Sequence, residues 1–208
     1  MNSDRVERFK KLPLGNICDA NQKQGNMDSG IKPVDPRSKL VGEAYTVKCY
    51  PKDNLAIHKA IYEAPKGSVL VVDTQGYYDC GYFGDIMALA CQVRGIAGLV
   101  IDGGCRDSED VQQMGFPIFS RTVNPGGTVK ETVGQTACPI VCGGVPVAAG
   151  DLVVADRDGV VVVKKEDVEK VLTAAETIAA KEVSVRERLL AYESTIEIFG
   201  LKKIMKMG

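Results

Sequence analysis

The chain has 208 residues, of which 45% are hydrophobic and 25% charged, and its formal net charge is −1. This length can bury a real core without disulfide or metal staples, and it predicts a single domain over residues 1–208. The near-neutral charge excludes a strong general attraction to nucleic acid or to an anionic membrane, so neither is expected as a partner.

Targeting signals and cysteine usage predict a cytoplasmic protein. The N-terminal stretch MNSDRVERFKKL is charged and lacks the apolar region of a signal peptide. No apolar run approaches the ~18 residues of a membrane-spanning helix. The seven cysteines form no C-x-x-C pair, so we expect reduced, mostly buried thiols rather than a zinc site, and Cys105 is not expected to be a nucleophile. Lys202, Lys203 and Lys206 are expected to form a solvated tail.

The expected elements follow one another with a change of pattern past the middle of the chain. Helical signals cover residues 14–25, 54–64, 84–95 and 107–115, and strand signals cover 39–50, 67–76, 95–104 and 117–123. This alternation predicts a central sheet with parallel pairs and helices packed against it. Beyond residue 127, short β-rich segments with glycine turns, the first of them at 127–134, suggest antiparallel strands. From about residue 165 we expect one or two long amphipathic helices, so the fold class is mixed α/β rather than a simple Rossmann repeat.

The helix expected over residues 54–64 carries His58, the one histidine of the chain. Asn54 is placed to cap this helix, and Pro65 to stop it. No metal-ligand partner is visible near His58 in the sequence, so a surface or edge position is favoured over a ligand role.

The segment GGCRDSEDV, residues 103–111, places one arginine and three acids directly after a buried strand. In parallel α/β sheets, ligands gather at the carboxyl ends of the strands. The two glycines would let the chain turn sharply and approach a ligand closely. Arg106 offers a forked donor set for a carboxylate or a developing oxyanion, and Asp107 and Asp110 are hard oxygen ligands suited to Mg²⁺ or Mn²⁺.

A second glycine-bearing junction precedes this one. Gly84 and Asp85 open the helix, so the amides of Ile86 and Met87 could receive an anion such as a carboxylate. Both junctions also have an ordinary interpretation, because Asp-x-x-Asp after a strand is commonly an N-cap followed by first-turn acids. The combination of two such junctions around one strand and an arginine beside the acids favours a ligand site.

These segments together resemble the RraA-like family, which includes the regulator of ribonuclease activity A and the divalent-metal-dependent 4-hydroxy-4-methyl-2-oxoglutarate aldolases. The resemblance rests on the segments CDANQKQG, KLVGEAYTVK, FGDIMALACQVRGIAGLVIDGGCRDSED and GVPVAAGDLVVADRDGVVVV. It implies a swivelling β/β/α domain with a mixed central sheet and C-terminal helices. It also implies a homotrimer or a dimer of trimers, with the site at a subunit interface.

The resemblance assigns roles to residues of both junctions. Asp107 would hold a largely hydrated Mg²⁺ or Mn²⁺, and Asp85 would bond to water on that metal. Arg106 would bind the keto or enolate oxygen of a pyruvate-like substrate. The backbone at Gly84, Asp85, Ile86 and Met87 would take the substrate carboxylate.

Two further acids bear on the function that the resemblance implies. The segment AAKEVSVRERL resembles the helix by which a neighbouring subunit supplies a glutamate, which makes Glu182 the candidate. Asp110 stands three residues after Asp107, where metal-dependent members of the family keep an acid, and this favours an enzyme over a metal-free regulator.

The implied activity is that of a class II pyruvate aldolase, a lyase that cleaves 4-carboxy-4-hydroxy-2-oxo acids to pyruvate. Oxaloacetate decarboxylation is its expected companion, because both reactions form pyruvate enolate. The alternative is a non-catalytic, protein-binding regulator of ribonuclease activity. A methyltransferase is disfavoured, because no strand–GxGxG loop for S-adenosylmethionine is present. The aromatic loop at residues 77–83 is expected to pack rather than to contact the far end of a substrate.

Overall fold

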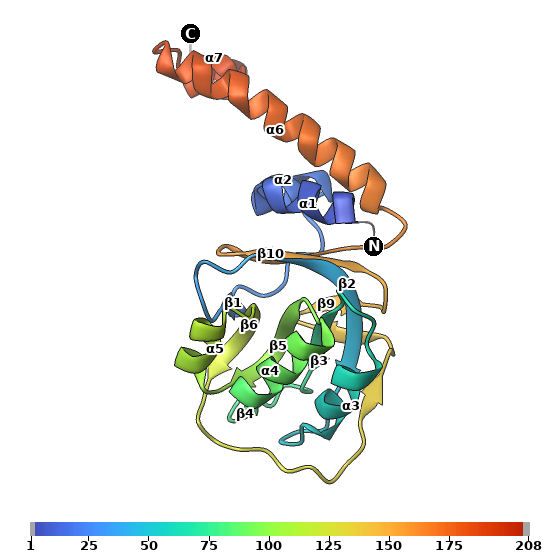
Figure 1. The fold of residues 1–208 in the computed structure, drawn as a ribbon. Coiled ribbons are helices and arrows are strands. Elements are labelled where there is room, and N and C mark those ends of the chain that lie inside the picture. The colour runs from blue at the N-terminus through green and yellow to red at the C-terminus, as the bar shows by residue number, and fades with distance from the viewer. Residues whose placement is uncertain (1–2, 206–208) are drawn as a thin grey trace.

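The structure is a computed structural model that describes residues 3–205 (Figure 1). The helices are α1 (Ser3–Lys11), α2 (Leu14–Ala20), α3 (Leu55–Glu63), α4 (Asp85–Arg94), α5 (Ser108–Met114), α6 (Val168–Leu190), α7 (Thr195–Ile198) and α8 (Lys202–Met205). The strands are β1 (Lys32–Pro33), β2 (Leu40–Lys48), β3 (Val69–Asp73), β4 (Gly81–Phe83), β5 (Gly98–Cys105), β6 (Ile118–Val123), β7 (Gln135–Thr136), β8 (Ile140–Cys142), β9 (Val145–Val147), β10 (Leu152–Asp156) and β11 (Gly159–Val163).

The main sheet has the strand order β1-β6-β5-β3-β2-β10-β11, with β4 paired to β5 and β7 paired to β2. The pairs β2–β3, β3–β5, β4–β5 and β5–β6 are parallel, whereas β10 pairs antiparallel with both β2 and β11. This confirms the expected mixed architecture, parallel in the middle of the chain and antiparallel later. The parallel strands β3 and β5 are buried along almost their whole length, as strands covered on both faces are.

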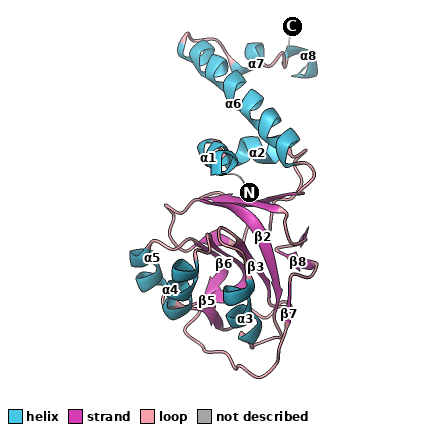
Figure 2. Cartoon of the chain, turned by 45° about the vertical axis from the view of Figure 1, so that its right-hand side comes forward, coloured by secondary structure: helices cyan, strands magenta, loops and turns pink. Residues whose placement is uncertain are grey.

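Helices α3, α4 and α5 cover one face of the parallel strands (Figure 2). Their apolar residues pack with Leu70, Val72, Leu99 and Ile101 in one buried cluster. The opposite face, including Val71 and Val100, packs with residues of β8 to β11 in a second cluster. A third cluster joins β10 and β11 to α1, α2 and the first turns of α6. The parallel strands are thus packed on both faces, between helices α3 to α5 and the strands β8 to β11.

Helix α6 leaves this body after its first turns (Figure 1). Its buried residues are Val168, Val171, Leu172 and Ala175, all in the first third of the helix. The Arg8 side chain of α1 donates two hydrogen bonds of 2.8 Å to Glu176, which fixes the angle at which α6 departs. Beyond that point the helix extends as an arm that ends in α7 and α8. No helix among residues 3–205 is long and apolar enough to cross a bilayer.

Three sequence expectations differ from the structure. Helix α2 ends at Ala20 rather than at Gly25, because Gln22 and Lys23 adopt left-handed conformations of their own. Residues 127–134 form an irregular loop and no strand. The short helices α7 and α8 follow the single long helix and were not expected; a capping box of Ser194 and Glu197 starts α7. Of the three tail lysines, Lys202 and Lys203 are exposed and Lys206 lies outside the described residues.

Candidate functional site

A cavity of about 270 Å³ opens where β4 ends and α4 begins. It is lined by Asn54, His58, Gly81, Tyr82, Gly84, Asp85, Ile86, Met87, Arg106, Asp107, Gly127, Thr128 and Lys130. The two glycine-bearing junctions that the sequence singled out therefore meet at one cavity. The parallel pairing of β4 with β5 causes this, because both strands end at the same edge of the sheet.

Asp107 stands at the N-cap of α5, but its side chain makes no capping hydrogen bond. Its backbone is left-handed, with φ 53° and ψ 39°, a conformation that is costly for a residue with a side chain. A Cβ atom on Gly84 would lie only 2.3 Å from Asp107 Oδ2, so the carboxylate lies directly against that glycine. The capping interpretation of Asp107 is therefore wrong, and the carboxylate faces the cavity instead.

Arg106 reaches across the same two junctions. Its backbone amide donates to the Phe83 carbonyl at 2.9 Å, and its Nε lies 3.3 Å from Asp107 Oδ2. The aliphatic part of the side chain passes over Gly81, where a Cβ atom would lie 2.8 Å from Arg106 Cβ. The Arg106 side chain remains about half exposed, at 47%, so its guanidinium is available to an anionic ligand.

The head of α4 supplies backbone donors. The first hydrogen bond of this ten-residue helix runs from the Ala88 amide to the Gly84 carbonyl, at 3.0 Å. Gly84 has no side chain to cap the helix, so the amides of Ile86 and Met87 lie at its positive end. Asp85 is half-buried at the cavity rim, in the first turn.

The cavity is also lined by three residues that sequence reasoning does not assign to the site, here called its second wall: Asn54, His58 and Lys130. Asn54 does not cap α3; its Nδ2 donates to the Tyr82 carbonyl at 2.8 Å, and its Oδ1 is buried without a partner. His58 Nε2 is likewise buried and unpartnered. Burial, and secondarily Lys130, lower the pKa of His58, so the imidazole is neutral at pH 7. The spacing of four between Asn54 and His58 was the available signal, because it puts both on one side of a helix.

Two expectations about the motif itself need correction, and a third agrees with the structure. Gly103 and Gly104 continue β5 rather than forming a turn, and a Cβ on Gly104 would lie 2.3 Å from the Cys80 carbonyl oxygen. Gly104 thus admits the Cys80 backbone, and Gly103 admits the Thr74 side chain, whose Cγ2 would lie 2.6 Å from a Cβ on that glycine. Asp110 is exposed in the first turn of α5 and does not line the cavity. Cys105 is fully buried beside Ser120, and burial raises its pKa, which fits the expectation that it is no nucleophile.

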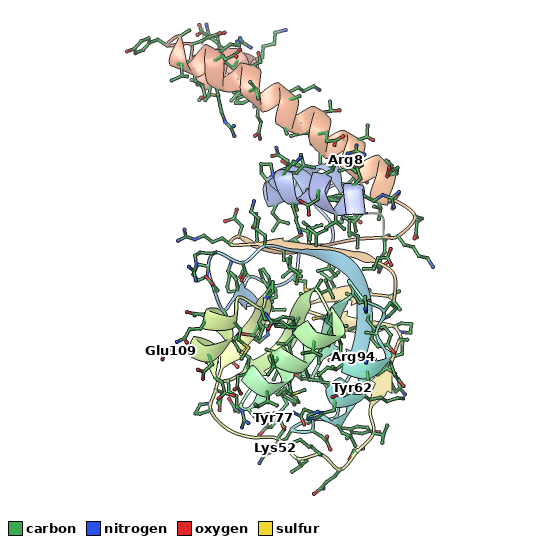
Figure 3. The ribbon with its side chains drawn as sticks, viewed as in Figure 1. Arg8, Lys52, Tyr62, Tyr77, Arg94 and Glu109 are labelled. Carbon is green, nitrogen blue, oxygen red and sulfur yellow. The ribbon has the colours of Figure 1, made fainter. Side chains whose placement is uncertain are left out.

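Glu182 lies on the α6 arm, away from the cavity in the same chain. It pairs with Arg186 at 3.2 Å and borders a groove between α6 and α7. In Figure 3, Lys52 and Tyr77 mark the end of the body that lies opposite the arm. Since Lys52 adjoins Asp53 and Asn54, the cavity belongs to that end. A single chain therefore does not bring Glu182 to Arg106 and Asp107.

The donor set indicates which metal the cavity suits. Within residues 3–205, no three His, Cys, Asp or Glu side chains cluster at metal-ligand spacing. Asp107 and Asp85 offer carboxylate oxygens, and the cavity has room for water. This set fits Mg²⁺ or Mn²⁺, which keep several water ligands, and does not fit a closed zinc site.

Known proteins are similar to this chain over nearly its whole length. A protein of Halalkalibacterium halodurans named "Putative 4-hydroxy-4-methyl-2-oxoglutarate aldolase" is 39% identical over 188 residues, which are 90% of this chain and 89% of that protein. The solved structure of Streptomyces coelicolor RraAS2, described as an unusual member of the RNase ES inhibitor RraA protein family, matches with a TM-score of 0.80 at 28% identity and covers 90% of this chain and 98% of that one.

A smaller solved structure matches the body of the fold. The RNA-processing inhibitor RraA of Thermus thermophilis has a TM-score of 0.67 at 25% identity, over 74% of this chain and 93% of that one. The fold expected from the resemblance is thereby confirmed. A family model described as "RraA-like: Aldolase/RraA" matches residues 14–162, which include every residue that lines the cavity. The chain belongs to the RraA-like family.

Proposed function

We propose that the protein is a divalent-metal-dependent lyase that cleaves 4-carboxy-4-hydroxy-2-oxo acids, such as 4-hydroxy-4-methyl-2-oxoglutarate, and releases pyruvate. One observation carries the proposal: the Arg106 guanidinium, the Asp107 carboxylate and the amides at the head of α4 line one cavity. A 2-oxo acid has a carboxylate beside a carbonyl, and these three groups match that pair. The name of the H. halodurans relative supports the same class of substrate.

The 2-oxo acid end would bind across the two junctions. Its carboxylate accepts hydrogen bonds from the Ile86 and Met87 amides, where the helix dipole favours negative charge. Its keto oxygen faces the Arg106 guanidinium. As the C3–C4 bond breaks, negative charge moves onto that oxygen, and the fixed guanidinium stabilises it more in the transition state than in the ground state. Asp107 would hold Mg²⁺ or Mn²⁺, and the bound ion would supply Lewis-acid polarisation of the 2-oxo group.

The far end of the substrate would meet the second wall. The Lys130 ammonium can pair with the carboxylate on C4, and the neutral His58 and Asn54 can exchange hydrogen bonds with the C4 substituents. This placement would supply partners to Asn54 Oδ1 and His58 Nε2, whose burial without partners otherwise costs free energy. Of the aromatic loop, the Tyr82 and Phe83 side chains are fully buried in the core, and Gly81 and Tyr82 line the cavity.

Cleavage requires that the C4 hydroxyl lose its proton. Asp85, which lines the cavity, would take this proton through one water molecule. The electrons of the O–H bond form the new carbonyl at C4, and those of the C3–C4 bond remain on the pyruvate enolate. Protonation of the enolate at C3 then gives pyruvate. Loss of CO₂ from oxaloacetate yields the same enolate, so decarboxylation is the expected companion activity.

Glu182 would join Asp85 from a second copy of the chain in a homotrimer or a dimer of trimers. Two unpartnered surfaces support this arrangement. On α4, Ile86, Leu89 and Val93 form an exposed apolar stripe that begins at the cavity, with exposed fractions of 72%, 50% and 77%. On the α6 arm, Val183, Leu189 and Leu190 are also exposed. Exposed apolar patches of this kind mark contact surfaces in soluble proteins.

The decisive test is pyruvate release, coupled to lactate dehydrogenase. Purified protein is assayed with 4-hydroxy-4-methyl-2-oxoglutarate and with oxaloacetate, with Mg²⁺ or Mn²⁺ and then with EDTA. We expect release from both substrates, loss of release with EDTA, and loss in Asp107→Ala. Release from oxaloacetate alone would indicate a decarboxylase or an aldolase for another 2-oxo acid. Release from neither would refute the lyase.

A second candidate function is a protein-binding regulator of ribonuclease activity. Two descriptions favour it: the Thermus structure is that of an RNA-processing inhibitor, and Streptomyces RraAS2 is an unusual member of the RNase ES inhibitor family. A pull-down with ribonuclease E tests it directly. Retention of the enzyme on immobilised protein at physiological salt, without any pyruvate release, would make this the function.

A further inference from the structure

The loop that carries one wall of the cavity has little regular structure of its own. Residues 124–134 form neither helix nor strand, apart from a single bridge at Val129. The loop nevertheless contributes Gly127, Thr128 and Lys130 to the cavity. An irregular segment of this length holds a side chain in place only if its backbone groups are bonded elsewhere.

The buried carboxylate of Asp53 supplies those bonds. Asp53 is 3% exposed. Its Oδ2 accepts hydrogen bonds from the Glu131 amide at 2.8 Å and the Thr132 amide at 2.7 Å, and its Oδ1 accepts one from the Leu55 amide at 2.9 Å. One carboxylate thus ties the loop to the first turn of α3, the helix that carries His58.

The backbone around Asp53 also connects the loop to Tyr82, in the segment that precedes Gly84. The Val129 amide donates to the Lys52 carbonyl at 2.9 Å, and the Asn54 amide donates to the Val129 carbonyl at 3.2 Å. The Lys52 amide donates to the Tyr82 hydroxyl at 2.7 Å, next to the Gly84 junction. Figure 3 shows Lys52 at this end of the body.

The electrostatics agree with a fixed, ionised carboxylate. Burial alone would raise the pKa of Asp53, but the amides of Leu55, Glu131 and Thr132, together with Lys130, outweigh burial and lower it. A charged acceptor of three amide hydrogen bonds is stronger than a neutral one.

We propose that Asp53 is the positioning residue of this site: it holds the loop 124–134 against α3, so that Lys130 and His58 face the same substrate carboxylate. Asp53 does not touch substrate and acts only through these neighbours. The inference rests on the proposed function for its kinetic consequence, whereas the anchoring of the loop can be measured without any substrate.

The test variant is Asp53→Asn, which keeps the shape of the side chain. The single oxygen of the asparagine cannot accept hydrogen bonds from both Leu55 and the pair Glu131 and Thr132. Its NH₂ group would face backbone N–H donors, to which it cannot bond. The matched control is Asp151→Asn. Asp151 is 2% exposed and also accepts a backbone amide, from Ala148 at 2.9 Å, but it lies in the turn between β9 and β10 and does not line the cavity.

The first measurement is amide hydrogen exchange in the absence of ligand. In Asp53→Asn we expect exchange at Glu131 and Thr132 to accelerate about tenfold, the loss of roughly one charge-assisted hydrogen bond. Exchange in β3 and β5 should stay at the wild-type rate, as should exchange at Glu131 and Thr132 in Asp151→Asn. Unchanged exchange at Glu131 and Thr132, or an acceleration spread evenly over the chain, would overturn the anchoring role.

The second measurement separates KM from kcat. In Asp53→Asn, the KM for 4-hydroxy-4-methyl-2-oxoglutarate should rise about tenfold, because the far carboxylate loses a placed partner. Exchange of pyruvate methyl protons with D₂O, which involves no second carboxylate, should proceed as in wild type. Equal loss in both reactions, or the same KM change in Asp151→Asn, would overturn the positioning role. Wild-type protein inactive in both assays would refute the proposed function and leave the loop result standing.

Discussion

The cavity end of the body and the α6 arm are built in opposite ways. At the cavity, the two charged residues of the motif lie in close contact with glycine backbone: Arg106 lies over Gly81, and Asp107 lies against Gly84. On the arm, Glu182 has one partner, Arg186, and most of the residues beyond Ala175 are exposed. The cavity residues meet within one chain, whereas Glu182 lies on an arm that makes few contacts with the rest of that chain.

This difference indicates how the two regions contribute to function. Preorganised groups at the cavity can bind and stabilise charge without reorganising during the reaction. A solvent-exposed helix cannot hold a carboxylate with that accuracy until something packs against it. The cavity should therefore determine whether chemistry occurs at all, and the arm should modulate it through assembly.

The largest expected effect tests the cavity end. Arg106→Ala should lower kcat for pyruvate release by ~10²–10³-fold, about 3–4 kcal/mol of lost transition-state stabilisation. The matched control is Arg94→Ala at the far end of α4, where the guanidinium lies over the Tyr62 ring, 5.5 Å from its centroid (Figure 3). Steady-state kinetics of both variants with oxaloacetate checks this. Arg106→Ala with wild-type turnover would remove Arg106 from the mechanism.

The contact between Asp107 and Gly84 can be broken by a substitution that leaves the charged residues Arg106 and Asp107 unchanged. Gly84→Ala leaves an ordinary extended backbone, with φ −138°, but puts a Cβ 2.3 Å from Asp107 Oδ2. The carboxylate must move, and a misplacement of about 1 Å can cost ~10²-fold in rate. The midpoint of the Mg²⁺ dependence of pyruvate release should shift upward as well. Gly15→Ala, with nothing within 4 Å of the new methyl group, is the control that should remain fully active.

The role of the arm is tested by mixing variants. Glu182→Gln should lower activity by about tenfold, below the ~10²–10⁴ of a sole general acid–base, because Asp85 shares the task. Glu187→Gln, on the same exposed helix, should have no effect. If Glu182 acts in a neighbouring copy, co-refolded Arg106→Ala and Glu182→Gln chains should be more active than either variant alone, because some of their sites combine a wild-type Arg106 with a wild-type Glu182. No recovery, with both chains present in one oligomer by native mass spectrometry, would rule out a shared site.

The smallest effect concerns the protonation of His58, the only histidine of the chain. Its NMR titration should give a pKa below 6.5, and Lys130→Ala should raise that pKa only part of the way, because burial is the larger cause. The unfolded chain then binds a proton more readily than the folded one. Stability should fall as the pH drops through about 6.5, and His58→Gln should reduce that dependence. A pKa at or above 6.5 would contradict the buried, neutral imidazole.

Much of the fold could be predicted from local pattern. The runs that became β3, α4 and β5 have the period and the glycine boundaries of their elements, and burial followed from those periods. The sequence pattern wrongly predicts a β segment at residues 127–134, because Val and Thr have strand propensity. In the structure, the amides of Glu131 and Thr132 donate to Asp53, which is far away in sequence. The left-handed backbone of Asp107 had no local signal either, since Asp at that place is typical of a cap.

The two junctions and their chemistry can be predicted from the sequence: an arginine and acids after one strand, and a glycine-opened helix after another. These are local facts, because caps, periods and residue types act over a few positions. The fold brings both junctions to one cavity, adds Asn54, His58 and Lys130 to its lining, and leaves Glu182 elsewhere in the same chain. Strand pairing and the bonds of Asp53 bring these residues together across long sequence separations, and no local pattern records such contacts.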